Sequence, residues 1–334
     1  MCMPIPSEST VLDHFGVVDR ELRLYIAVGA NHPPSGVIAY LKYVPSESPQ
    51  PWRLAGTVFM KRVLPRYSPK HVDSSSRGMK RVYDPRLGCF VPVVEWFSIV
   101  KLIDPRSIAE RLLHSCRDEL ECLALELVSD LVSLGVPLNT IGVAGSIMFG
   151  IHNPTVSDID IVLYVDDERL AEVMESVRSV LEPVPGPRLE ELVKGVAELH
   201  GLPTELARLV YAVPRRGLYR GREVTVVYTD PAPLRLSEVM ESQCLEMVLE
   251  IEPNQPGFLK YPGHGIASRV HVGGRVLENV EVLSYEAAYS IPMYFGGAYM
   301  CRALLQRLSD GGFRVVLGSR ECHTYITRSH YLPT

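Results

Sequence analysis

The first hundred residues alternate between short apolar runs and clusters of turn residues. Leu22 to Val28 and Val37 to Val44 have the β-branched, apolar character of strands. The segment Asn31–Gly36 between them is rich in turn-forming residues, so the two runs predict a hairpin. Residues 54–64 predict a further strand after a Ser/Pro loop.

The next apolar pattern has the spacing of a helix. Asp104-Pro105 is typical of a helix start, and apolar residues from Ile108 to Leu134 recur every three to four positions. Gly135 follows the pattern directly, which predicts one long amphipathic helix that ends there.

Residues 141–165 hold the most distinctive pattern. An apolar run predicts a buried strand over 141–145 that ends in a Gly-Ser turn, and residues 147–151 predict the opening of a helix. A second apolar strand follows at 161–165, directly after Asp158 and Asp160. Because strand side chains alternate, these two aspartates are expected on one face, toward the Gly-Ser turn if the strands are neighbours.

The rest of the chain predicts helices and then strands. Helices are expected near 166–181, 188–200 and 203–212, before a strand at 223–229. Further strands are expected near 245–252, 268–272, 276–285, 298–307, 313–317 and 322–327, with a hairpin at Ser309–Gly312. Such spacing is typical of a small barrel or sandwich.

These patterns predict an α/β (α+β) fold class in three parts. A β-rich N-terminal domain is expected over 1–103, a core with a small mixed sheet and helices on one side over 104–234, and a β-rich C-terminal domain over 235–334.

Composition narrows the class of protein. The 334 residues are 46% hydrophobic and 22% charged, as in folded proteins, and the net charge of −5 argues against a general nucleic-acid coat. The start resembles no signal peptide, and no apolar run reaches the length of a membrane span. The seven cysteines form no Cys-x-x-Cys pair, which argues against a zinc site and a secreted disulfide framework. An intracellular disulfide stays open for a hyperthermophilic source.

The central stretch carries the strongest chemical signal. A Gly-Ser turn at a helix start offers backbone N–H groups to phosphate oxygens, so Gly145 and Ser146, with Ser157 nearby, are candidate nucleotide-binding residues. Asp158 and Asp160 can hold one or two Mg²⁺ ions that neutralise phosphate charge. This ordered combination predicts a site for phosphoryl or nucleotidyl transfer.

Gly145-Ser146 followed by Ser157-Asp158-Ile159-Asp160 resembles the signature of the DNA polymerase β-like nucleotidyltransferase superfamily. The resemblance implies a nucleotidyltransferase-like core in which the Gly-Ser turn binds triphosphate and the aspartate pair binds two metal ions. More loosely, with His32-Pro33-Pro34 near its start, the chain resembles uncharacterised archaeal nucleotidyltransferase-domain proteins. This wider likeness implies no particular substrate.

The resemblance also implies a third carboxylate on a later strand, and here the sequence departs from the pattern. The best-matching position is Thr225, which cannot serve as a carboxylate. Glu223, two residues earlier and on the same face of the strand, is the favoured substitute for this carboxylate and would also be catalytic. Asp230 at the strand end is the second possibility, and a metal site without a third carboxylate is the remaining one.

Two basic stretches are candidate contacts for phosphates. Residues 53–86 hold nine Lys/Arg interleaved with tyrosines, as in nucleic-acid surfaces, although ordinary solvated surface is the more common explanation. Arg215-Arg216-Gly217 precedes the strand at 223–229, and Arg216 is the candidate nucleotide contact there. His32 reads as a polar turn residue rather than a ligand.

The sequence therefore predicts an Mg²⁺-dependent enzyme that moves a nucleoside monophosphate from an NTP to an acceptor hydroxyl, RNA among the candidates. The alternative is a nucleotide- or RNA-binding protein whose metal site has lost its third carboxylate. The expected location is cytoplasmic, with no membrane partner. The sequence does not predict the oligomeric state.

Overall fold

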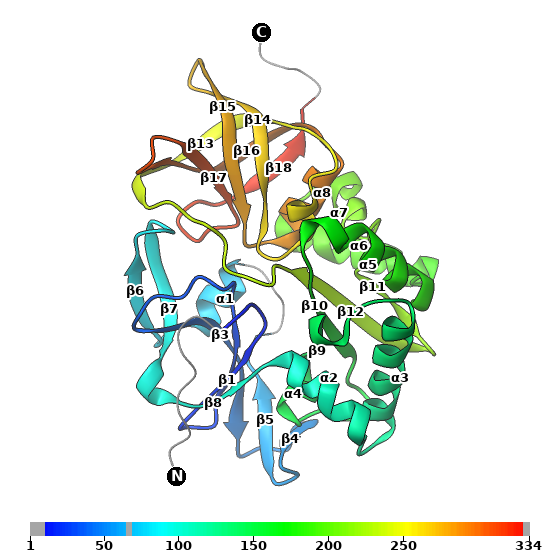
Figure 1. Ribbon diagram of the computed structural model, residues 1–334. Helices are drawn as coiled ribbons and strands as arrows, with labels where there is room; N and C mark the ends of the chain where they lie inside the picture. The colour runs from blue at the N-terminus through cyan, green and yellow to red at the C-terminus, as the bar shows by residue number, and fades with distance from the viewer. Residues whose placement is uncertain (1–10, 65–68, 330–334) are drawn as a thin grey trace.

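The computed structural model describes residues 11–64 and 69–329, and Figure 1 shows their arrangement. The structure is 39% strand and 28% helix, and a half-barrel sheet and a closed five-stranded β-barrel dominate the described residues. The expected α/β fold with a nucleotidyltransferase-like core is therefore wrong, because the strands of the half-barrel and the barrel make the described residues predominantly β-structure. The central sheet is small, and one of its faces packs against the half-barrel.

The half-barrel is built from the N-terminal strands. In the described residues it is an eight-stranded sheet in the order β4-β5-β3-β2-β1-β8, with β7 pairing β3 and β6. Its strands are β1 (Gly16–Asp19), β2 (Leu24–Ala27), β3 (Gly36–Ser46), β4 (Trp52–Leu54), β5 (Val58–Arg62), β6 (Lys80–Asp84), β7 (Cys89–Glu95) and β8 (Ile99–Ile103). A short helix, α1 (Pro69–Ser75), follows β5. The hairpin predicted around Asn31–Gly36 is confirmed as β2 and β3.

The central sheet has the order β11-β12-β10-β9, with β10 antiparallel to β9 and parallel to β12. Its strands are β9 (Ile141–Val143), β10 (Ile159–Tyr164), β11 (Arg216–Tyr219) and β12 (Arg222–Thr229). The helices of this region are α2 (Pro105–His114), α3 (Glu119–Ser133), α4 (Gly145–Phe149), α5 (Asp167–Val180), α6 (Gly186–His200) and α7 (Thr204–Leu209).

Strand alternation gives the two faces of the central sheet different neighbours. Ile159, Ile161 and Leu163 of β10 pack with α2, α3 and α5. Val162 and Tyr164 face the other way, into an apolar cluster with the half-barrel. Because Asp160 has the parity of Val162, its side chain belongs to the half-barrel face.

The C-terminal strands close into a barrel in the order β13-β14-β15-β17-β16, because β13 also pairs with β16. β18 extends the sheet beyond β16. The elements are β13 (Val239–Ile251), β14 (Gly263–Val272), β15 (Arg275–Ser284), α8 (Ala287–Tyr294), β16 (Gly297–Leu308), β17 (Phe313–Leu317) and β18 (Tyr325–Arg328). The predicted hairpin at Ser309–Gly312 is confirmed between β16 and β17.

The helix predicted from Ile108 to Leu134 is wrong in one respect, because the chain forms two helices there. Residues 115–118 leave the helix, and the Asp118 side chain accepts hydrogen bonds from the N–H groups of Leu120 and Glu121 to begin α3. The apolar spacing continues across the break because both helices cover the same face of the central sheet.

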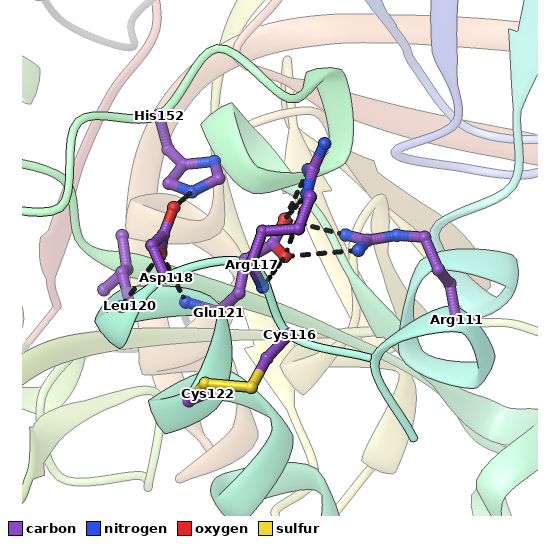
Figure 2. Close-up of a disulfide and its surroundings, with 8 residues drawn as sticks. All are labelled: Arg111, Cys116, Arg117, Asp118, Leu120, Glu121, Cys122 and His152. Atoms are coloured by element: carbon purple, nitrogen blue, oxygen red, sulfur yellow. Dashed lines mark hydrogen bonds and ion pairs between the residues drawn. A yellow bond between two sulfur atoms is a disulfide. The ribbon is translucent and has the colours of Figure 1, made fainter. Parts of the chain in front are cut away.

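Disulfides join four of the cysteines in the described residues, Cys116 to Cys122 and Cys244 to Cys322. The sequence left a disulfide open without indicating which cysteines would pair, and the absence of a secreted framework stays a prediction. Figure 2 shows the first disulfide beside the α2–α3 break, where Arg111 and Arg117 bind Glu121 and Asp118 binds His152 at 2.7 Å.

Candidate functional site

The Gly-Ser turn and the aspartate strand meet directly. Gly145 has a left-handed φ of +62°, and a Cβ atom added there would lie 1.9 Å from Asp160 Oδ2. The Ala144 N–H donates to the Asp160 carbonyl at 2.8 Å, which fixes the turn against β10. Only glycine satisfies both demands, so the predicted neighbourhood of Gly145 and Asp160 is confirmed.

The two serines of the motif differ in what is known of their side chains. Ser146 is buried within α4, and its backbone carbonyl accepts from the Ile151 N–H at 3.1 Å. Ser157 Oγ accepts from the Asn153 N–H at 3.1 Å, which closes the loop before β10. Arg222 donates to the Pro154 carbonyl of the same loop at 2.8 Å. A phosphate contact by either serine stays a prediction.

The charge of Asp160 disfavours the charged form of Asp158. Burial and then the Asp160 charge raise the pKa of the Asp158 carboxyl above its ordinary value, although Lys42 and Arg216 counteract the shift. Carboxylates in this situation gain free energy when a cation binds between them. Metal binding by Asp158 and Asp160 stays a prediction.

The register between β10 and β12 shows which residue occupies the expected position of the third carboxylate. Thr225 of β12 lies directly opposite Asp160 in the parallel ladder. Glu223 shares that face, but Arg188 Nε donates to it at 3.1 Å and Arg216 Nη2 also donates to it. Partial burial alone would raise the pKa of Glu223, but the two arginines hold it below its ordinary range. Glu223 would reach a metal only by releasing both arginines.

Asp230, the alternative third carboxylate, accepts from Lys260 Nζ at 2.7 Å. Lys260 is 1% exposed and also lies 2.5 Å from Asp167. Asp167, Asp230 and His264 bring their ligand atoms close enough for a metal ion. The Lys260 ammonium lies between the two carboxylates and offsets one of their two negative charges.

A cavity of about 420 Å³ lies where the half-barrel, the central sheet and the barrel meet. The half-barrel contributes Lys42 and Phe90, the central sheet Asp160 and Thr225, and the barrel Leu304, among others. Most of the walls are apolar or aromatic side chains. Pockets of this size and character hold small molecules and cofactors.

Arg215 is the cation whose position sequence reasoning missed. Burial lowers the pKa of Arg215 to about 10, so the guanidinium stays charged at neutral pH. It lines the cavity and donates to the Leu259 carbonyl at 3.2 Å. Across the described ranges, no carboxylate lies within ion-pair distance of it. The adjacent Arg216 binds Glu223 instead.

The other candidates have ordinary roles. His32 Nδ1 accepts from the Ile38 N–H at 3.2 Å, and burial lowers the pKa of His32 to about 4, which fits a neutral turn residue. In the basic stretch 53–86, Lys80 pairs with Glu95 and Arg86 pairs with Asp84, and contact of the stretch with nucleic acid stays a prediction. Residues 65–68 of that stretch lie outside the described residues.

None of the described helices is both long and apolar enough to cross a membrane. The comparisons with known proteins add no family to these observations: no family model, curated protein or solved structure matches the chain.

Proposed function

We propose that this protein binds a nucleotide in the cavity between its three β-structures. The observation that carries the proposal is Arg215, a charged, half-buried guanidinium in the cavity wall without a carboxylate partner among the described residues. A cation partly removed from water and lacking an anion is costly, and a bound phosphate reduces that cost. Arg215 shares the cavity with Gly145 and Asp160, the two motif residues in direct contact.

The cavity suits the rest of a nucleotide as well. Its walls combine aromatic side chains, such as Phe90 and Tyr261, with a few polar groups. Flat apolar walls favour a stacked base, while the charged groups favour phosphates.

The metal part of the proposal concerns one Mg²⁺ ion. Asp158 and Asp160 would hold it together with phosphate oxygens, since Mg²⁺ binds through one or two carboxylates and keeps several waters. The ion would neutralise phosphate charge. A second ion has no third carboxylate available, because Thr225 lies opposite Asp160 and Glu223 binds two arginines.

Nucleotidyl transfer to an acceptor hydroxyl, RNA included, is the second candidate function. The contact between Gly145 and Asp160 favours it, because it brings the Gly-Ser turn against the aspartate strand. An exposed pair of rings, Tyr83 and Phe90 with centroids 5.6 Å apart, offers a place for RNA bases to stack.

A cytoplasmic location also stays part of the proposal. The two disulfides are compatible with it if the source is a hyperthermophile, since intracellular proteins of hyperthermophiles do carry disulfides.

The test is calorimetric titration of each NTP, with and without Mg²⁺, into wild-type protein and Arg215→Gln. We expect the Arg215→Gln change to weaken binding at least tenfold and Arg215→Lys to restore part of it, since a phosphate needs the charge. Arg302→Gln, on the exposed face of β16, is the matched control and should bind as wild type does.

The metal is tested in the same titrations with Asp158→Asn/Asp160→Asn. This variant should bind NTP equally well with and without Mg²⁺, because it has lost the carboxylates but not Arg215. NTP binding that is equal in wild type and Arg215→Gln would contradict the proposal.

A further inference from the structure

Asp13 and His14 form a carboxylate–imidazole pair in the wall of the cavity that the proposed function does not use. Asp13 is 1% exposed, and its Oδ1 accepts from the Gly29 N–H at 2.6 Å. Its Oδ2 binds Nδ1 of His14. Because an ionised carboxylate can only accept hydrogen bonds, His14 carries a proton on Nδ1, and the lone pair of the neutral ring is on Nε2.

The second ring nitrogen of His14 is open to a bound molecule. His14 lines the cavity, and its side chain is 21% exposed. Nε2 faces away from Asp13, and no residue in the described part of the chain binds it. A histidine that is oriented through one nitrogen and open at the other can take a proton from a ligand or from water. Glu223, the catalytic carboxylate expected from the sequence, binds two arginines, which leaves the role of base open.

The backbone of His14 is held in an uncommon conformation. Its φ is +62°, in the left-handed region that residues other than glycine seldom adopt. The His14 N–H donates to the Ala27 carbonyl at 3.1 Å, and the Tyr164 hydroxyl donates to the Asp13 carbonyl at 2.8 Å, so both neighbours fix this conformation. Strained residues of this kind are concentrated at catalytic and ligand-binding positions.

His14 lies near Arg215, the residue proposed to hold a phosphate. The Arg215 guanidinium donates to the Leu259 carbonyl at 3.2 Å, and the His14 ring packs edge-on against the Tyr261 ring with centroids 5.8 Å apart. Leu259 and Tyr261 are two residues apart, which is at most about 7 Å along the chain. Burial lowers the pKa of Arg215, and the Asp13 carboxylate is among the groups that counteract this fall. Since His14 and Arg215 line the same cavity, a phosphate at Arg215 can lie beside a water molecule at Nε2.

We propose that the protein hydrolyses the terminal phosphate of the nucleotide in this cavity, with His14 as the general base. The inference rests on the proposed function, because Arg215 would hold that phosphate. The oxygen of a water molecule forms a bond to the terminal phosphorus, and the bond from this phosphorus to the bridging oxygen breaks. The nucleoside diphosphate leaves with the electron pair of the broken bond. One proton of the water moves to Nε2 of His14 and then to solvent, and inorganic phosphate is the second product. Asp13 is the positioning residue that orients the ring.

The test is the release of inorganic phosphate from ATP, CTP, GTP and UTP, with Mg²⁺, by wild type, His14→Gly and Asp13→Asn. Glycine suits the left-handed backbone at residue 14, so His14→Gly should fold, which its thermal midpoint shows. It should lower kcat about a hundredfold, as expected for the loss of a general base. Added imidazole should restore part of that kcat, because it supplies the missing base.

The matched control is Ala55→Gly, since Ala55 also has a left-handed φ, of +50°, but is exposed and lies outside the cavity. This variant should release phosphate as wild type does and should not respond to imidazole. Asp13→Asn should lower kcat at least tenfold with KM unchanged, because the ring is still present but is no longer oriented. An Asp13→Asn variant with unchanged kcat would overturn the positioning role.

Calorimetric titration of the same nucleotides separates the inference from the proposed function. His14→Gly should bind NTP as tightly as wild type, because Arg215 is intact. The inference is overturned if wild type binds NTP but releases no phosphate, if His14→Gly releases phosphate at the wild-type rate, or if imidazole restores none of the lost kcat. Absence of NTP binding by wild type overturns the proposed function with it.

Discussion

At the scale of single residues, two neighbours in the sequence have opposite roles. Arg215 lines the cavity, whereas Arg216 begins β11 and binds Glu223. The sequence shows two consecutive arginines just before a core strand. Which of the two lines the cavity depends on the side that each side chain faces. A one-residue change in parity exchanges the two faces, and no local pattern fixes that parity here.

The contact of Asp160 with Gly145 was predictable because the motif that carries both residues is local. Asp160 and Gly145 lie on adjoining elements joined by a short loop, so motif spacing was enough to bring them together. The position of Glu286 in the cavity wall was not predictable, since Gly318 and His200, which lie beside it, come from distant parts of the chain.

Gly145→Ala should destabilise the fold by about 3 kcal/mol, because it combines a left-handed φ with an overlap on Asp160. In the background of Asp160→Ala the same change should cost about half as much, since the overlapping carboxylate is gone. Urea denaturation of the four proteins measures this coupling. Equal costs of Gly145→Ala in both backgrounds would refute the contact.

Thr225→Asp should add the missing carboxylate opposite Asp160. If transfer is limited by that carboxylate alone, the variant should incorporate labelled nucleoside monophosphate into RNA above the wild-type level. Thr225→Asn, which matches the shape without the charge, should not. Equal incorporation by the two variants would show that the third carboxylate is not what limits transfer.

At the scale of elements, the break between α2 and α3 shows the limit of periodicity. The apolar spacing predicts a continuous helix, but a cap at Asp118 and a disulfide between Cys116 and Cys122 divide it. Asp118 also binds His152, in the loop that leads to the aspartates, so this break supports the candidate site (Figure 2).

Glu121 in this break should make stability depend on acid pH. Burial alone would raise its pKa, but hydrogen bonds from Arg117 and Arg111 lower it from 4.5 to about 2. A lowered pKa means that the stabilisation is full above pH 4.5 and is lost as the pH falls toward 2.

Glu121→Gln should therefore flatten the fall of stability between these pH values. At neutral pH it should cost about 2 kcal/mol, a modest value for a buried ion pair because both arginines are partly exposed. Denaturant midpoints across the pH range measure both effects. An unchanged pH profile in Glu121→Gln would rule out this carboxyl as the source.

The two disulfides should differ in their contribution, because they close loops of different length. Cys244 and Cys322 are 78 residues apart, whereas Cys116 and Cys122 are six apart. Chain-entropy estimates give about 4.5 kcal/mol for the long loop and about 2 kcal/mol for the short one. Denaturant titrations of variants in which both cysteines of one disulfide are changed to Ser test this difference in stability, with Cys89→Ser, at a free cysteine, as the control. A larger loss of stability on removing the short-loop disulfide would contradict the prediction.

At the scale of the whole molecule, the cavity exists only where the three β-structures meet. The sequence predicts most strands and the turn chemistry of each part, because these depend on local periodicity. It leaves open whether the C-terminal strands form a barrel or a sandwich, and it does not predict the packing of the half-barrel on the central sheet, since both depend on contacts between distant segments. The expected α/β class was wrong because the β-structure of the half-barrel and the barrel outweighs the central sheet and its helices.

The most direct test of the central claim is a crystal structure of the protein grown with an NTP and Mn²⁺ in place of Mg²⁺. We predict one anomalous peak beside the Asp158 and Asp160 carboxylates, with phosphate density within hydrogen-bond distance of Arg215 and the base in the same cavity. An empty cavity at saturating nucleotide, or a nucleotide bound elsewhere on the protein, would contradict the account.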